Sequence, residues 1–339
     1  MTGFTIPSHV PADLVRDFDF ADMRGGTDVY AHFAALHDGP DIIYTPHHGG
    51  HWVATRFADM EVILTDKIAF SSRHQTVPPM PITLTLIEWD GDLHADARKV
   101  LSPFFSPKSV SNLELVARDL TISLIDGFYE RGECDFVEEF ALKMPIIIVM
   151  SLMGLPDEDT PYLMQISEDI VRSTDPVVQA AAFQRVFDYI ANDVMPKRRA
   201  NPGRDIFSAI LDAKIEGGRP FTDAEIISFG AVLIAAGLDT VASTLGFLTE
   251  FLAENPNHRR ALVADPGLIN DALEEMMRRF HIANIARVVA RDMDYKGLIF
   301  KAGDRILIPT AAAGIDARRY PEPFEVDFAR GDKKTLVFG

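Results

Sequence analysis

The sequence predicts a mainly α-helical fold with a small β-rich lobe, and three observations support this. Apolar residues recur at spacings of three and four through most of the segment from about 107 to 281, as in amphipathic helices. Short β-prone runs bounded by glycine and proline lie on either side of it, at about 40–56 and 286–310. One apolar segment, Thr222 to Asn255, is long enough for a buried helix of roughly 50 Å.

Composition narrows the classes of protein. The chain has 339 residues, 47% of them hydrophobic, and can bury a large core as one big domain or two smaller ones. A net charge of -17 argues against nucleic acid and anionic membranes as partners. The single cysteine, Cys134, excludes an intrachain disulfide, and we interpret it as a small structural residue. Residues 1–19 show no signal peptide or membrane anchor, so we expect a cytoplasmic protein.

The first hundred residues are expected to combine a small sheet with helices. Ile42 to Thr45 and His51 to Thr55 read as a β-hairpin, and Phe57 to Thr65 has helical periodicity. The turn of the hairpin contains His47 and His48. Together with His51 they are more typical of turn residues than of a metal site.

A proline-rich loop from His74 to Leu86 follows. It is apolar and has no tyrosine, so a pocket lined by it would offer hydrocarbon and small hydroxyl groups. Ile82 and Leu84 of this loop, with Leu233 of the long helix, are therefore candidate substrate-pocket residues.

The next helix, entered at about Trp89 and running to Phe105, presents a possible anion site. His94 and Arg98 are four residues apart and share one face, where they could hold a carboxylate. An ordinary solvated face is the alternative. Arg98 and Lys99, with Lys108 beyond, also form a local basic patch in an acidic protein, which suits an acidic docking partner.

Helix follows helix through the middle of the chain, with Gly and Pro at the joins. The predicted helices are Ser109 to Arg131, Phe136 to Met153, Thr160 to Ser173, Val177 to Arg198 and Ile206 to Lys214.

The long segment from Thr222 to Asn255 has clear ends and a break in its middle. Thr222 and Glu225 can form a capping box, and Pro256 ends the helix. The break is Ala236-Gly237-Leu238-Asp239-Thr240, which contains the only charge between Ile226 and Leu248. Thr240 can bond back to the preceding turn and bend the helix, while Gly237 leaves room for a flat ligand. Two alternatives to a ligand site at this break are a simple kink whose aspartate is paired across the core, and a membrane span. The segment lacks the basic flanks that anchor and orient such a span.

The last hundred residues turn from helix to strand. Ile269 to Phe280 is a predicted helix in which Glu275 and Arg278 can pair on one face. Short strands are expected at Ala286 to Ala290, Tyr295 to Phe300 and Asp304 to Pro309, with turns at Gly297 and Gly303. The tail from Ala311 onward reads as irregular.

Taken together, these features resemble the cytochrome P450 family over the whole chain, closest to soluble bacterial members of the camphor-hydroxylase type. The resemblance implies one P450 domain over residues 1–339, incomplete at its C-terminus. The motifs that carry it are His51-Trp52-Val53-Ala54-Thr55-Arg56 with Phe70-Ser71-Ser72, His94 with Arg98, Ala236-Gly237-Leu238-Asp239-Thr240, Glu275-Met276-Met277-Arg278, and Arg287.

The resemblance also implies roles for these residues. Asp239, Thr240 and Gly237 correspond to the oxygen-activating motif, with Thr240 as a hydrogen-bond donor and Asp239 as a proton relay. His94, Arg98 and Arg287 correspond to residues that hold the haem propionates, and Ala236 would lie against the haem. Glu275 and Arg278 correspond to a buried structural pair.

Two departures from the family pattern are expected. By alignment, Glu325 stands where many members have a third charged partner, an arginine, for the Glu275–Arg278 pair, so that partner is predicted to be missing or replaced. The chain also ends at Phe338-Gly339, which resembles the start of the loop that carries the haem-ligating cysteine. No metal ligand is therefore expected within these residues; the cysteine would follow Gly339, and the chain is predicted to be a fragment without the last helix.

The function implied is a haem b monooxygenase that oxidises a small apolar, terpenoid-like molecule. It would take electrons from a ferredoxin and its reductase, because the chain has no flavin or iron-sulfur segment of its own. Two alternatives remain open. One is a haem-free, catalytically inactive helical protein that binds apolar ligands, and the other is a membrane-embedded helix bundle built on Ile226 to Leu248.

Overall fold

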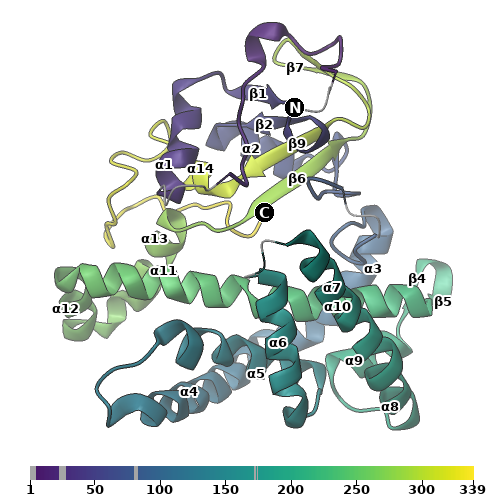
Figure 1. Ribbon diagram of the computed structural model, residues 1–339, viewed down its shortest axis with the longest axis vertical. Coiled ribbons are helices and arrows are strands. Elements are labelled where there is room, and N and C mark those ends of the chain that lie inside the picture. Colours follow the sequence, from purple (N-terminus) through teal and green to yellow (C-terminus); the bar gives the residue numbers. More distant parts are fainter. Residues whose placement is uncertain (1–4, 23–27, 80–82, 172, 174) are drawn as a thin grey trace. The chain divides into compact units, whose positions relative to one another are not determined.

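The computed structural model describes residues 5–22, 28–79, 83–171, 173 and 175–339 (Figure 1). It divides into two compact units. The first unit is made of Met1–Thr83 and Phe247–Gly339, and the second is the continuous segment Leu84–Gly246.

The first unit is built on a five-stranded sheet with the order β1-β2-β9-β6-β3. The expected hairpin is present as an antiparallel pair of β1 and β2. β2 then pairs in parallel with β9, where Trp52 lies opposite Ile306, and β6 pairs antiparallel with β9. Trp52, Phe70 and Ile308 are buried in the core beside the sheet. The strands are β1 (Ile42–Thr45), β2 (His51–Ala54), β3 (Phe70–Ser71), β6 (Asn284–Val289) and β9 (Arg305–Pro309).

Short helices and a hairpin complete the first unit. The hairpin joins β7 to β8 through Lys296 and Gly297, two residues with positive φ. The elements are η1 (Ala12–Leu14), α1 (Val29–Ala34), η2 (Ala35–Asp38), η3 (His47–Gly49), α2 (Phe57–Thr65), α12 (Pro256–Ala264), η9 (Pro266–Leu268), α13 (Ile269–Arg279), β7 (Met293–Tyr295), β8 (Leu298–Phe300) and α14 (Thr310–Gly314).

The second unit is helical apart from a small hairpin. Its core gathers side chains from most of its helices, with Phe207, Phe229 and Ile190 fully buried. The elements are α3 (Gly91–Leu101), η4 (Ser102–Phe105), α4 (Pro107–Tyr129), η5 (Val137–Ala141), α5 (Lys143–Met153), η6 (Asp157–Asp159), α6 (Thr160–Val171), α7 (Pro176–Tyr189), η7 (Ile190–Val194), α8 (Met195–Ala200), α9 (Ile206–Asp212), β4 (Lys214–Ile215), η8 (Glu216–Gly218), β5 (Arg219–Pro220) and α10 (Asp223–Leu238). α11 (Thr240–Glu254) begins in this unit.

The long apolar segment forms two consecutive helices, α10 and α11, which meet at Asp239. The predicted capping box is confirmed, since Glu225 N–H donates to Thr222 Oγ1 and Thr222 N–H donates to Glu225 Oε2. The segment Asp223–Glu254 is long and apolar enough to cross a membrane, but α10 packs against α5, α7 and α9. The helix was expected to be buried, whereas 47% of its most apolar window is buried.

The histidines near the β1–β2 turn were interpreted from the sequence as turn residues, and the single cysteine as a small structural residue. His47 bonds to Asp17 and His48 to Asp19, while burial lowers the pKa of His51 to about 4. Within the described part of the chain, no three His, Cys, Asp or Glu side chains are grouped to hold a metal ion. Cys134 is exposed between α4 and η5.

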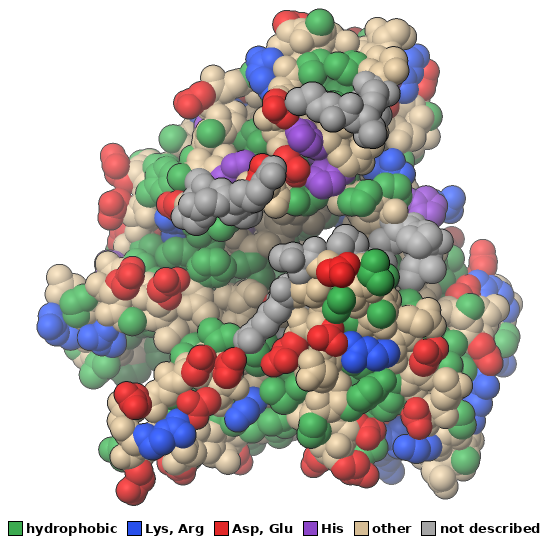
Figure 2. Space-filling model, in the orientation of Figure 1, with side chains coloured by type: hydrophobic (Ala, Val, Ile, Leu, Met, Phe, Trp, Pro, Cys, Tyr) green, Lys and Arg blue, Asp and Glu red, His purple; other side chains and the backbone are tan. Residues whose placement is uncertain are grey.

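One face of the molecule carries side chains of both charges (Figure 2). Acidic side chains are scattered among hydrophobic and basic ones on the face shown in Figure 2. This distribution agrees with the net charge of -17.

Candidate active site

The junction of α10 and α11 brings together Ala236, Gly237, Asp239 and Thr240. Thr240 Oγ1 donates to the carbonyl oxygen of Ala236 at 2.8 Å, the back-bond expected to bend the helix. The helix resumes with Ser243, whose N–H donates to the Asp239 carbonyl oxygen at 2.8 Å and whose hydroxyl donates to Asp239 Oδ1 at 3.1 Å. The break is therefore held by local hydrogen bonds.

One face of this junction carries exposed residues. Ala236 and Thr240, four residues apart, are both exposed, and Asp239 is half-buried. Leu233, one turn before Ala236, is half-buried and packs against the core of the second unit. The second unit thus has an exposed strip formed by Ala236 and Thr240, with the half-buried Asp239 carboxylate beside the Thr240 hydroxyl.

Gly237 has a packing role. A Cβ atom built on it would lie 2.1 Å from Cγ2 of Val149 on α5, far inside van der Waals contact. The glycine therefore lets α10 approach α5 closely. We had expected its missing side chain to leave room for a ligand, whereas on that side the space is filled by Val149.

Helix α3 carries the predicted anion-binding pair. His94 is half-buried and Arg98 is exposed one turn later. Among the described residues, none hydrogen-bonds to or forms an ion pair with the Arg98 guanidinium. Lys99 instead donates to Asp96 Oδ1 at 2.8 Å. Arg98 is thus the cation of this helix that is available to an anionic group.

Arg287 lies in the first unit, on β6 opposite Ile306 of β9. Its Nη1 donates to Gln75 Oε1 at 2.8 Å and to the carbonyl oxygen of Ala286 at 3.0 Å. The side chain is half-buried, so the strand and Gln75 fix its direction.

The predicted substrate loop is described in part. Ile82 lies outside the described residues, and Leu84 is half-buried. The loop is fastened to α10, because Thr85 N–H donates to Ser228 Oγ at 2.9 Å. Glu88 and Ser228 were not predicted as site residues, since neither belongs to a recognisable spacing pattern.

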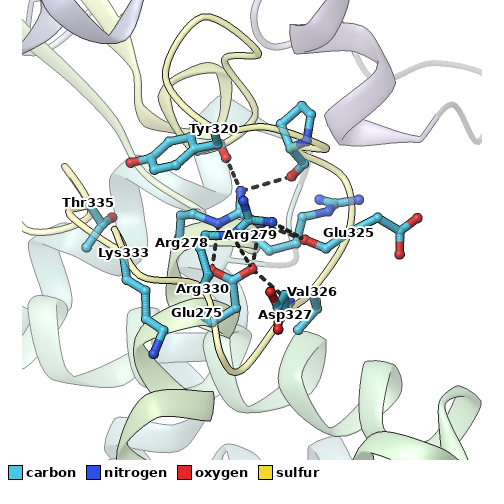
Figure 3. Close-up of polar contacts among 12 residues, drawn as sticks. Glu275, Arg278, Arg279, Tyr320, Glu325, Val326, Asp327, Arg330, Lys333 and Thr335 are labelled. Carbon is cyan, nitrogen blue, oxygen red and sulfur yellow. Dashed lines mark hydrogen bonds and ion pairs between the residues drawn. The ribbon is translucent and has the colours of Figure 1, made fainter.

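The predicted Glu275–Arg278 pair is present and fully buried (Figure 3). Arg278 Nε donates to Glu275 Oε2 at 2.9 Å, and Arg278 Nη2 donates to Glu275 Oε1 at 3.0 Å. The expectation that no arginine completes the pair was wrong. Arg330 Nε donates to Glu275 Oε1 at 2.9 Å, while Glu325 offers its backbone carbonyl oxygen to Arg278 Nη2, also at 2.9 Å.

These bonds keep Glu275 ionised. Burial by itself would raise its pKa, but hydrogen bonds from Arg278, Asp327 N–H and Arg330 lower the pKa below the usual 4.5. Figure 3 shows the Arg278 guanidinium between the Glu275 carboxylate and the segment that carries Glu325. One carboxylate on α13 therefore anchors the loop from 320 to 330, which has little regular structure of its own.

Comparison with known proteins gives consistent matches, although no protein-family model matches the chain. The chain is 32% identical to the probable cytochrome P450 127A1 of Sinorhizobium fredii, over 98% of this chain and 83% of the relative. It is 31% identical to a steroid C26-monooxygenase of Mycolicibacterium smegmatis, over 80% of this chain and 69% of the relative.

Solved structures agree with these relatives. The crystal structure of CYP101J2 matches with a TM-score of 0.86 and 34% identity, over 99% of this chain and 85% of that chain. The structure of cytochrome P450 CYP101C1 matches with a TM-score of 0.83 and 34% identity, over 96% of this chain and 83% of that chain.

We predict that Gly237→Ala destabilises the protein by about 1–3 kcal/mol, because the new methyl group overlaps Val149. Gly127→Ala on α4 is the matched control. A Cβ there meets nothing within 4 Å, so the same change should stabilise by about 0.5–1 kcal/mol. The midpoint of urea unfolding measures both. Equal midpoints for the two variants would contradict the close approach of α10 to α5.

We predict a ranking for the two arginines around Glu275. Arg278→Met should cost about 3–5 kcal/mol, because a buried carboxylate loses its bidentate partner. Arg330→Met should cost less, about 1–3 kcal/mol, because Arg278 still holds Glu275. Urea unfolding of both variants tests this order, with exposed Arg260→Met on α12 as the control. An Arg330 variant at least as unstable as the Arg278 variant would reverse the assignment.

Proposed function

This chain belongs to the cytochrome P450 family, and from that premise we propose which substrate, electron donor and residues this monooxygenase uses. Haem is the cofactor of the family and, when bound, supplies the oxidising chemistry. The proposed reaction places one oxygen atom of O2 in a C–H bond of a small apolar, terpenoid-like substrate. The other oxygen atom leaves as water, which consumes two electrons and two protons.

The residues of the chain fit a haem group in their chemistry. Its propionates are anions, and Arg98 is an exposed guanidinium that no described residue engages, next to His94 on the same helix face. Arg287 is a second cation with a fixed direction, in the first unit. The flat apolar ring of haem suits an exposed helix strip with a residue as small as Ala236. We assign His94, Arg98, Arg287 and Ala236 to cofactor binding on these grounds.

The observation that carries the proposal is the break at Asp239 and Thr240. The Thr240 hydroxyl has one proton and two acceptor sites, so it can accept a hydrogen bond while it donates one to the carbonyl oxygen of Ala236. Asp239 is half-buried and held by Ser243, which leaves its carboxylate in reach of water. In this proposal Asp239 passes protons from solvent to the exposed strip, and Thr240 orients by hydrogen bonding the group that receives them.

The substrate class rests on apolar side chains of the predicted loop and of α10. Leu84 and Leu233 are half-buried apolar residues of the second unit. Ile82 stays a candidate of the same loop. A pocket with such walls binds by apolar burial, which favours a compact hydrocarbon such as a terpenoid.

Electrons come from a ferredoxin in this proposal. Lys99 is 76% exposed on α3, and its ion pair with Asp96 is a weak surface interaction. Together with Arg98 and Lys108 it forms the basic patch noted in the sequence, which suits the acidic surface of such a donor. We also propose that the protein is soluble and cytoplasmic, since its longest apolar helix, α10, packs against other helices of the second unit.

We predict that Thr240→Ala uncouples the enzyme. The variant is made in the protein as its organism produces it and is supplied with ferredoxin and reductase. It should consume NADH at a rate similar to that of the wild type but release mainly hydrogen peroxide. The substrate would be camphor or another terpenoid that the wild-type protein turns over. Thr244→Ala is the control, because Thr244 makes the same kind of back-bond, 2.7 Å to the Thr240 carbonyl oxygen. Both variants should keep a strongly red-shifted Soret band with carbon monoxide.

Unchanged coupling in Thr240→Ala would remove its assigned role. No red-shifted band in the folded wild-type protein would contradict the monooxygenase itself. No turnover of any terpenoid would contradict the substrate class.

We predict that Lys99→Glu slows reduction by the ferredoxin about 3- to 10-fold at low salt, because it reverses a charge at the docking patch. Stopped-flow reduction measures the rate. Lys197→Glu on α8 is the control, with the same charge change at an exposed site outside the patch. Arg98 is not used, since it is assigned to the cofactor. The difference should vanish at high salt. Equal rates for the two variants at low salt would move the docking site elsewhere.

A further inference from the structure

A tight turn from Leu84 to Trp89 joins the predicted substrate loop to helix α3. Leu84 N–H donates to the Glu88 carboxylate oxygen Oε2 at 2.8 Å, and Glu88 N–H donates back to the Leu84 carbonyl oxygen at 3.0 Å. Trp89 N–H donates to the carbonyl oxygen of Leu86 at 3.3 Å. The Glu88 side chain thus closes a ring with the backbone of the residue four positions earlier.

Ser228 fastens this turn to α10. Its hydroxyl oxygen accepts the Thr85 N–H at 2.9 Å, and both residues are buried. Ser228 lies eight residues before Ala236, or about 12 Å along the helix. The turn is therefore held against α10, the helix that carries Ala236 and leads to Asp239 and Thr240.

Two features of the turn oppose stability. Leu86 has a φ of 78°, a left-handed conformation that costs free energy for a branched side chain. Glu88 is 1% exposed, and its second oxygen, Oε1, has no hydrogen-bond partner among the described residues. A buried carboxylate with an unpaired oxygen is unfavourable. Both features are explained if the turn must keep one shape at this place.

We propose that Glu88 and Ser228 are positioning residues that hold the turn from Leu84 to Trp89 in one conformation against α10. We call the hydrogen bonds from Leu84 N–H to Glu88 and from Thr85 N–H to Ser228 the clamp. The clamp makes Leu84 a rigid wall for a bulky apolar ligand bound in the second unit, and it determines which sizes of ligand bind well. This inference rests on the proposed function, because it takes Leu84 as a pocket residue.

The first test is direct and needs no ligand. Glu88→Leu removes the acceptor of the Leu84 N–H, and Ser228→Ala removes the acceptor of the Thr85 N–H. In the full protein, amide hydrogen exchange should be at least tenfold faster at Leu84 in the first variant and at Thr85 in the second. Glu88→Gln keeps an acceptor and should exchange like the wild type at Leu84.

Ser167→Ala is the matched control for the serine. Ser167 on α6 is also buried, but its hydroxyl has no partner among the described residues, so its removal should leave the turn unchanged. The unfolding midpoint of Glu88→Leu should not fall, because an apolar side chain replaces a poorly paired buried carboxylate. Unchanged exchange at Leu84 and Thr85, or a loss of stability without faster exchange at those amides, would overturn the clamp.

The second test separates ligand size from haem access. Imidazole and 4-phenylimidazole are spectral probes of the haem-loaded protein. In Glu88→Leu and Ser228→Ala, the Kd of 4-phenylimidazole should rise at least fivefold, because a loosened wall is no longer preorganised. The Kd of imidazole should stay within twofold, and Glu88→Gln and Ser167→Ala should match the wild type for both probes.

The outcomes are distinguishable. Equal changes for both probes, or no change for either, would overturn the role of the clamp in ligand size. A wild-type protein that shows no haem spectrum would contradict the proposed function. Hydrogen exchange at Leu84 and Thr85 would still decide whether the clamp exists.

Discussion

The buried carboxylate of Glu275 is the interaction on which much of the first unit depends. It accepts hydrogen bonds from two arginines and from the backbone N–H of Asp327. One of these arginines, Arg278, also donates hydrogen bonds to the carbonyl oxygens of Pro323 and Glu325. A charge removed from water is unfavourable unless every site around it is filled, and here the loop from 320 to 330 fills them. The loop thereby gains a fixed path, although it has almost no regular secondary structure.

In the second unit, the neighbouring residues of one short motif carry separate tasks. Gly237 brings α10 against α5 through contact with Val149, and Thr240 bonds back to Ala236 where the helix breaks. Packing on one side and an exposed strip on the other thus occur within five residues. The same helix holds the turn at Glu88 through Ser228, so its packing also affects the neighbouring loop.

Local signals in the sequence were sufficient for most helices. The capping box at Thr222, the break at Asp239 and the extent of α2 depend on neighbours within a few residues, and all three are as predicted. Interactions between residues far apart in the sequence were harder to predict. Arg330 was missed because loop shape, and not position in an alignment, brings its guanidinium to Glu275. The two-residue strand β3 and the five-residue helix α14 are too short for periodicity, and tertiary contacts hold them in place.

The parallel pairing of β2 with β9 has a consequence for biosynthesis. The two strands are separated by about 250 residues, so strand pairing in the sheet of the first unit cannot be completed until β9 has left the ribosome. At about 5–20 residues per second, the hairpin of β1 and β2 waits for tens of seconds with an unpaired edge. The second unit is continuous in the chain and meets no such delay, since all of its residues emerge before β9. The nascent hairpin therefore needs protection from aggregation for longer than any helix of the second unit.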